Sequence, residues 1–176
     1  MRHSDVRNRL QPALLDRLAD DDRHAQREVD EQRVMSKAQL RQAVLRDLGA
    51  LFNAVQPLSA AAARAYPALA GSVLNYGLPA LSGQLASKLD VSVLERAIRD
   101  AIVRFEPRIL PGTLQVRALE ASSVLDTHNV IEFEIRGHLW AQPVPLEILL
   151  RTQLDLEAGQ VEVRDAGAQR SASYGP

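Results

Sequence analysis

The chain has 176 residues, a formal net charge of −1, 46% hydrophobic residues and only 4% aromatic residues. This length suits one domain with extensions at its ends and one hydrophobic core. A near-neutral charge argues against binding a run of phosphates, and scarce aromatic rings argue against a platform for stacked bases, so we expect no nucleic-acid partner. Cysteine is absent, which excludes disulfides and thiolate ligands.

The first twenty residues mix both charge signs and lack the apolar core of a signal peptide. No uninterrupted apolar stretch approaches the roughly 18 residues that indicate a membrane span. We therefore expect a cytoplasmic protein with no direct membrane insertion.

Residues 1–33 divide into a short leucine-rich segment and a charged linker. The segment has one apolar helical face, made of Leu10, Leu14, Leu15 and Leu18. Residues 20–33 are mostly charged, which is typical of a solvated linker. Two interpretations stand level: the leucines fold back onto the same chain, or they dock as a helix in the groove of a partner.

Two amphipathic helices are predicted. The first begins at a capping box, Ser36 to Gln39, and ends before Pro57. The second runs from about Ser92 to Phe105, with Asp90 or Ser92 as its cap, and stops before a proline. Ser92 and Glu95 repeat the capping-box spacing, and we expect Glu95, like Asp47 of the first helix, to lie on the solvent side of its helix. Between the two helices, an alanine-rich stretch predicts short helical turns broken at Pro67, followed by a structured loop over 72–83.

After the second helix the apolar pattern changes from helical to alternating, over residues 114–119, 131–139, 146–154 and 161–164. Strands with one apolar and one polar face form antiparallel sheets that are covered on one side. We predict an α+β fold, with N-terminal helices packed on one face of a three- to four-stranded antiparallel sheet. This domain spans residues 34–165, and we expect residues 166–176 to form a disordered tail.

The sequence contains no metal-ligand spacing, no glycine-rich phosphate loop and no nucleophile motif, so we expect no cofactor and no metal. The most concentrated polar group is Phe105-Glu106-Pro107-Arg108, where the second helix gives way to the sheet. Glu106 and Arg108 predict a salt bridge that locks helix to sheet. The alternative is a catalytic Glu106 acting as a general acid, for which no second carboxylate is evident.

Tyr76 precedes Gly77 in the loop between the two helices. A tyrosine here either covers the core, with its hydroxyl reaching a carbonyl or solvent, or is an aromatic contact for a partner. Composition favours the first interpretation.

Four segments together resemble the TssE family: QPALLDRLADDD (11–22), QRVMSKAQLRQAVLRDLGALFN (32–53), PALAGSVLNYGLPALSG (67–83) and AIRDAIVRFEPRIL (97–110). These proteins are the small wedge subunits of bacterial type VI secretion baseplates, within the phage baseplate wedge family often labelled "lysozyme-like". The most distinctive motif is FEPR, directly behind an amphipathic helix. Ala80 departs from the family pattern, where an acidic residue is expected after Pro79.

The resemblance implies a non-enzymatic structural subunit that initiates contractile sheath polymerisation through contacts at the edge of its sheet. It implies as partners the wedge proteins TssF, TssG and TssK, the sheath proteins TssB and TssC, and the spike and tube proteins VgrG and Hcp. Glu106, Pro107 and Arg108, with Tyr76 and Gly77, would then bind a partner or form an internal clasp. Leu14, Leu15 and Leu18 would tether the chain to the wedge.

Two other functions stay open at the level of sequence. One is a peptidoglycan-cleaving glycosidase with Glu106 as general acid, as the "lysozyme-like" label suggests. The other is a generic soluble adaptor in which FEPR is only a structural clasp.

Overall fold

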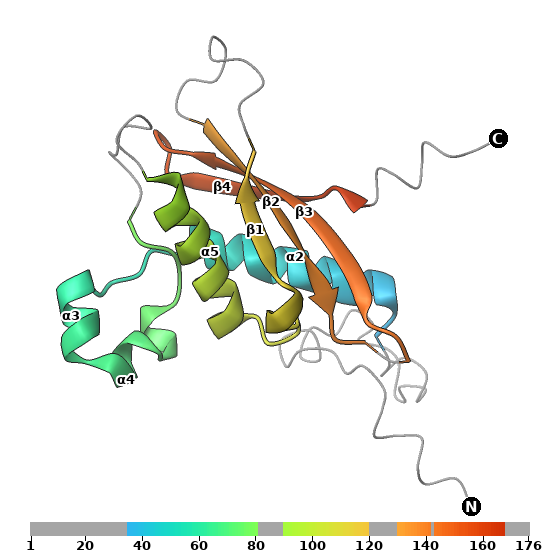
Figure 1. Cartoon of the computed structure of the whole chain (residues 1–176), viewed down its shortest axis with the longest axis horizontal. Coiled ribbons are helices and arrows are strands. Elements are labelled where there is room, and N and C mark those ends of the chain that lie inside the picture. Colours follow the sequence, from blue (N-terminus) through green and yellow to red (C-terminus); the bar gives the residue numbers. More distant parts are fainter. Residues whose placement is uncertain (1–34, 81–89, 120–129, 142, 168–176) are drawn as a thin grey trace, which may run out of the picture.

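A computed structural model of the chain describes residues 35–80, 90–119, 130–141 and 143–167. Helices come first and strands follow, and the four strands form one antiparallel sheet (Figure 1). The predicted α+β fold is confirmed. The leucine-rich segment (Leu10, Leu14, Leu15 and Leu18), the charged linker and residues 168–176 lie outside the described residues.

Helix α2 spans Lys37–Asn53 and begins at the predicted capping box. The amide oxygen of Gln39 accepts from the Ser36 backbone N–H at 2.8 Å, and the Ser36 hydroxyl accepts from the Gln39 N–H at 3.2 Å. Two N–H groups that the helix cannot satisfy internally are thereby paired. One face of α2 is buried, through Leu40, Ala43, Val44, Leu48, Leu51 and Phe52.

Helix α5 spans Val91–Phe105 and is capped by Asp90, whose carboxylate accepts from the Ser92 N–H at 2.9 Å. The capping box that the sequence offers between Ser92 and Glu95 is therefore not used. Glu95, predicted to face solvent, is half-buried, and its carboxylate accepts from the Ala118 N–H at 2.7 Å.

A small lobe precedes α5, as the alanine-rich pattern predicts. It contains α3 (Ala60–Ala65), α4 (Pro67–Ala70) and the 3-10 helix η3 (Val73–Asn75), and it projects beside α5 (Figure 1). Arg104 of α5 donates to the Ala70 carbonyl at 2.8 Å, which ties the lobe to the body. Within the described residues, no helix has the length and apolar character needed to cross a bilayer.

The sheet is a meander in the order β1-β2-β3-β4, preceded by the 3-10 helix η5 (Pro111–Thr113). Its strands are β1 (Gln115–Ala118), β2 (Val130–Leu139), β3 (Leu146–Asp155) and β4 (Gln160–Asp165). β2 and β3 pair along their whole length, from Val130 opposite Asp155 to Leu139 opposite Leu146. Strands β1 and β4 are the two edges.

One hydrophobic core lies between the helices and the inner face of the sheet. Its most buried strand residues alternate along the two central strands: Phe133, Ile135, Leu139, Ile148, Leu150 and Leu154. α2 packs against β4, and α5 packs against β1 and against α2. The alternation of apolar and polar residues along the strands thus marks the face of the sheet that the helices cover.

Thr152 of β3 is an exception on this inner face. It is fully buried, and its hydroxyl has no hydrogen-bond partner among the described residues. A buried hydroxyl without a partner costs roughly 1–3 kcal/mol of stability.

We therefore expect Thr152→Val, which keeps the shape and removes the hydroxyl, to stabilise the fold by about 1 kcal/mol in thermal or denaturant unfolding. The matched control is Thr113→Val. The hydroxyl of Thr113 donates to the Leu110 carbonyl at 2.8 Å and accepts from the His138 N–H at 3.0 Å, so its loss should destabilise. Destabilisation by Thr152→Val would show that this hydroxyl is satisfied in solution.

Candidate functional site

The FEPR motif sits where α5 ends and the chain joins the sheet. Glu106 is the C-cap of α5, and its N–H donates to the Ile102 carbonyl at 2.8 Å. Beyond Pro107 the backbone pairs with the end of β2: the Trp140 N–H donates to the Arg108 carbonyl at 2.7 Å, and Ile109 bridges Leu139. The motif therefore joins helix to sheet through its backbone.

The side chains of the motif point to a different element. Arg108 forms a fork on Glu106, with its Nε 2.6 Å from Oε1 and its Nη2 2.5 Å from Oε2. The same Nη2 lies 2.5 Å from the Oδ2 of Asp47 on α2. Asp47, Glu106 and Arg108 thus form one ion-paired cluster, which we call the clasp, and it fastens the end of α5 to the middle of α2.

Burial makes this pairing necessary. Glu106 is only 3% exposed, and a buried carboxylate without a partner is strongly unfavourable. The hydrogen bonds that Arg108 donates to Glu106, with the negative charge of Asp47, raise the pKa of Arg108 above its ordinary value. The guanidinium therefore stays charged, and it compensates the charge of the buried Glu106 carboxylate.

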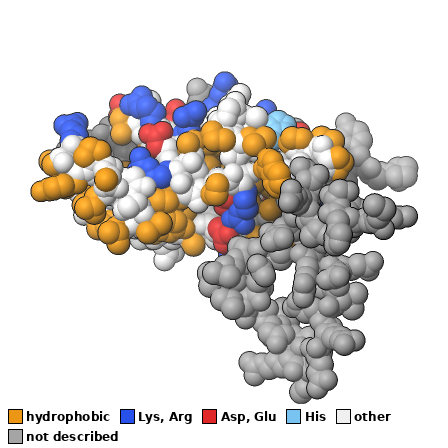
Figure 2. Space-filling model, turned by 90° about the horizontal axis from the view of Figure 1, so that it is seen from below, with side chains coloured by type: hydrophobic (Ala, Val, Ile, Leu, Met, Phe, Trp, Pro, Cys, Tyr) orange, Lys and Arg blue, Asp and Glu red, His pale blue; other side chains and the backbone are white. Residues whose placement is uncertain are grey.

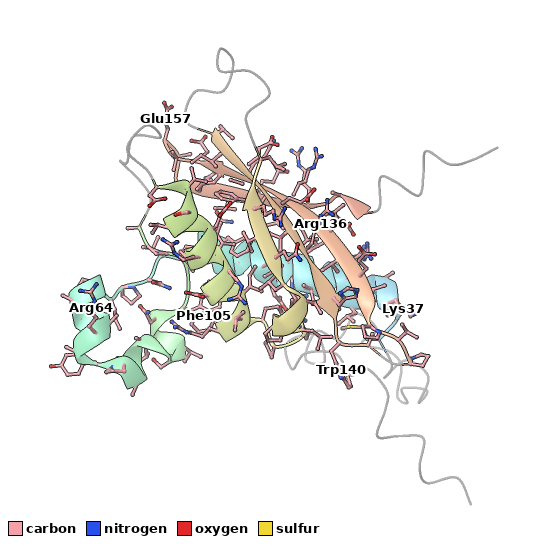
Figure 3. The ribbon with its side chains drawn as sticks, in the orientation of Figure 1. Lys37, Arg64, Phe105, Arg136, Trp140 and Glu157 are labelled. Carbon is pink, nitrogen blue, oxygen red and sulfur yellow. The ribbon has the colours of Figure 1, made fainter. Side chains whose placement is uncertain are left out.

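Tyr76 and Phe105 cover the clasp on one side. Their rings meet edge to face, with centroids 5.2 Å apart and planes at 66°, a favourable aromatic geometry. The Tyr76 hydroxyl donates to the Asp47 carbonyl at 3.5 Å. Burial raises the pKa of Tyr76, and the charges of Asp47 and Glu106 raise it further, so the hydroxyl stays neutral. Figure 3 shows Phe105 at the end of α5, on the side of the lobe.

Gly77 fixes the loop that carries Tyr76. Its φ of 120° is one that L side chains rarely adopt, and a Cβ there would lie 2.3 Å from the Ala54 carbonyl oxygen. This close approach lets the Leu78 N–H donate to the Ala54 carbonyl at 2.9 Å, while the Gln56 N–H donates to the Leu78 carbonyl at 2.8 Å. The loop is thus held by two backbone hydrogen bonds to the segment that follows α2.

A cavity of about 410 Å³ opens beside the clasp. Its charged lining residues are those of the clasp, and the other lining residues are mostly apolar: Met35, Leu40, Leu48, Leu51, Tyr76, Phe105 and Pro107. Within the described parts of the chain, no group of three or more potential metal ligands gathers here or elsewhere.

The lobe forms a second distinctive surface. Its side chains Tyr66, Val73 and Leu74 are 63%, 79% and 67% exposed, and Leu69 is 38% exposed. Figure 2 shows hydrophobic side chains gathered at the end of the molecule that α3 and α4 form. A contiguous exposed apolar surface of this kind is typical of proteins that assemble with others.

Sequence reasoning found Glu106 and Arg108 but missed Asp47, which it placed on the wet side of α2. Asp47 borders the buried stripe, between Val44 and Leu48, yet nothing in the sequence says that the end of α5 crosses α2 at this point. Leu14, Leu15 and Leu18 lie outside the described residues and cannot be placed relative to the clasp.

The family model of the baseplate wedge protein gp25 matches residues 38–144. The chain belongs to this family. The matched region runs from α2 through the lobe, α5 and the clasp to β2, so it contains every residue of the site described above except Met35. Comparison with curated proteins and with solved structures gave no match. The family, which includes TssE, confirms the resemblance drawn from the sequence motifs.

The clasp predicts a specific pattern of stabilities. Arg108→Ala leaves the buried Glu106 without a charged partner, because only the backbone N–H of residue 108 still donates to it, at 3.1 Å in the wild type. This should cost roughly 3 kcal/mol, at the low end for a buried pair because Arg108 is partly exposed. In Glu106→Met/Arg108→Met no lone charge is buried, so the double variant should recover most of this loss. Denaturant unfolding measures both, and a double variant no more stable than Arg108→Ala would contradict the account.

Gly77→Ala should destabilise more than any ordinary surface substitution, because the added Cβ meets the Ala54 carbonyl and the backbone φ is unfavourable. The control is Gly49→Ala in α2, where nothing lies within 4 Å of the added Cβ. That change should stabilise by about 1 kcal/mol because alanine favours the helix. Equal melting temperatures for the two variants would refute the close approach at Gly77.

Proposed function

We propose that this chain is a non-enzymatic structural subunit of a type VI secretion baseplate, working in the cytoplasm. The observation that carries the proposal is the family match, which covers the helices, the clasp and half of the sheet. In this role the chain assembles with the wedge proteins TssF, TssG and TssK and initiates polymerisation of the TssB–TssC sheath. The spike and tube proteins VgrG and Hcp lie near it in the assembled baseplate.

The sheet supports a role in templating. A four-stranded meander covered by helices on one face has two edge strands, and an edge can accept an extended segment through backbone hydrogen bonds. The exposed apolar side chains of the lobe support a further contact, with the neighbouring wedge proteins.

The clasp supports a structural role in place of a catalytic one. Because Asp47 and Glu106 each lie 2.5 Å from one nitrogen of Arg108, their oxygens are at most about 5 Å apart, close to the spacing of a retaining glycosidase pair. One guanidinium nitrogen, however, donates to both carboxylates. Glu106 is moreover almost inaccessible to a substrate. A general acid must reach the substrate, and a carboxyl group that is buried and paired with Arg108 does not.

The glycosidase remains the competing function because of that spacing. It predicts that purified protein clears peptidoglycan and that Glu106→Gln abolishes clearing while the fold is retained. We expect no clearing by either protein.

The N-terminal residues 1–33 complete the proposal. In it, Leu14, Leu15 and Leu18 form a docking helix that tethers the folded domain, residues 34–165, to the wedge across the charged linker. A helix with a single apolar face gains most of its stability from such a groove, because it is marginal alone in water.

Sheath assembly in cells tests the templating role. In a strain that lacks this chain and carries fluorescent TssB, the wild-type copy should restore sheath foci. A copy with Val116→Pro on β1 and Val163→Pro on β4 should not restore them, because both edges then lack a donor. The double variant must be checked for folding by its melting temperature. Normal foci with a folded double variant would rule out strand addition as the template.

A further inference from the structure

Both edges of the sheet carry a side chain from a helix on an outward-facing backbone group. On β1, the Leu119 N–H donates to the Glu132 carbonyl, so by antiparallel alternation Val116 and Ala118 direct their backbone groups away from β2. On β4, the Ala166 N–H donates to the Leu149 carbonyl, so Val161 and Val163 face away from β3. These outward groups are the ones that an added strand would pair with.

On the β4 edge, Asn53 at the end of α2 caps Val161, while among the described residues no hydrogen-bond partner lies on the outward groups of Val163. The Asn53 amide nitrogen donates to the Val161 carbonyl at 2.8 Å, and its amide oxygen accepts from the Val161 N–H at 3.0 Å. The carboxamide thus reproduces both bonds that a neighbouring peptide would make. The same nitrogen also donates to the Gly49 carbonyl at 2.8 Å, which fixes the side chain on its own helix. Val161 is 9% exposed, so its side chain is covered as well.

The β1 edge is covered differently. Glu95 of α5 accepts one hydrogen bond, from the Ala118 N–H at 2.7 Å, and a carboxylate cannot donate to any carbonyl of the strand. Among the described residues, no hydrogen-bond partner lies on the outward groups of Val116. Val116 and Ala118 are only half-buried although they face the core, so the inner side of this edge retains apolar surface that another side chain can cover.

We propose that β1 is the strand-accepting edge of this protein and that Glu95 is a displaceable cap on it. This inference rests on the proposed function and specifies which edge the sheath uses. An incoming segment of a sheath subunit would replace the Glu95 carboxylate with a backbone carbonyl at Ala118 and pair with Val116. Until then Glu95 blocks the edge and hinders pairing with other chains.

The chemistry of the edge also describes the segment. Its inward residues are apolar, because they extend the surface of Val116 and Ala118. The alternate side chains of the segment, on the solvent face of the sheet, lie beside Gln115 and Arg117. These two residues line a polar hollow with Glu134 and Arg136. Glu134 is paired with Arg136 at 2.7 Å, whereas Arg117 has no ion-pair partner within the described residues. We therefore expect the segment to alternate apolar and polar residues and to place an acidic side chain beside Arg117, on the solvent face of the sheet.

Binding of purified TssB–TssC to the immobilised full-length chain tests the proposal. Glu95→Ala removes the cap, so binding should become about tenfold tighter, which is the worth of one hydrogen bond to a charged group. Glu95→Gln keeps an accepting oxygen and should stay near wild type. Asp100→Ala, which removes the same charge from an exposed position on α5, should not change binding.

The two edges are separated by single prolines, with melting temperatures measured alongside. Val116→Pro removes an outward donor of β1 without removing a hydrogen bond to β2, and should abolish binding, while Val163→Pro on β4 should leave it intact. If Val163→Pro abolished binding, Val116→Pro did not, and Glu95→Ala bound with wild-type affinity, the choice of β1 as the accepting edge would be wrong. Loss of binding in Val116→Pro with unchanged affinity in Glu95→Ala would overturn the cap. Binding that neither proline affects would instead refute strand addition, and with it the templating role.

Discussion

The guanidinium of Arg108 is the group on which the rest of the structure depends. It neutralises Glu106, a carboxylate that is 3% exposed at the end of α5, and reaches Asp47 on α2 with the same nitrogen. The backbone carbonyl of Arg108 accepts a hydrogen bond from the Trp140 N–H at the end of β2. One residue thus holds the two long helices and the sheet together, and its charge is what makes the burial of Glu106 tolerable.

The regular elements could be predicted because each has a local cause. The capping box at Ser36 and Gln39, the break at Pro67 and the alternation along 131–139 and 146–154 are visible in the sequence, and the structure contains all of them. The contacts between elements were harder to predict from the sequence. Asp47 and Glu95 read as solvent-facing charges because helical periodicity shows only which face is apolar. It does not show which neighbouring element a bordering polar side chain can reach.

The same distinction applies to the FEPR motif. The sequence predicted a salt bridge between Glu106 and Arg108 that locks helix to sheet. The pair exists, but its side chains lock helix to helix, and the link to the sheet is made by the backbone. Only the three-dimensional crossing of α5 over α2 supplies the second carboxylate, which is why no spacing rule could find it.

The two edges of the sheet are capped in different ways. Polar side chains from the two long helices, Asn53 and Glu95, occupy outward groups on opposite edges. At the β4 edge Asn53 satisfies both the donor and the acceptor of Val161, whereas at the β1 edge Glu95 satisfies the donor of Ala118 alone. The two edges and the exposed apolar lobe on α3 and α4 are thus three surfaces of different chemistry.

The most direct test of the central claim is co-purification of the tagged full-length chain with co-expressed TssF and TssG, beside a Glu106→Ala/Arg108→Ala variant whose melting temperature is also measured. The account predicts that the wild type recovers both wedge proteins in fixed proportion. A folded variant that loses them would place the clasp at or beside the assembly surface. A well-folded wild type that recovers neither protein would contradict the assignment to the baseplate.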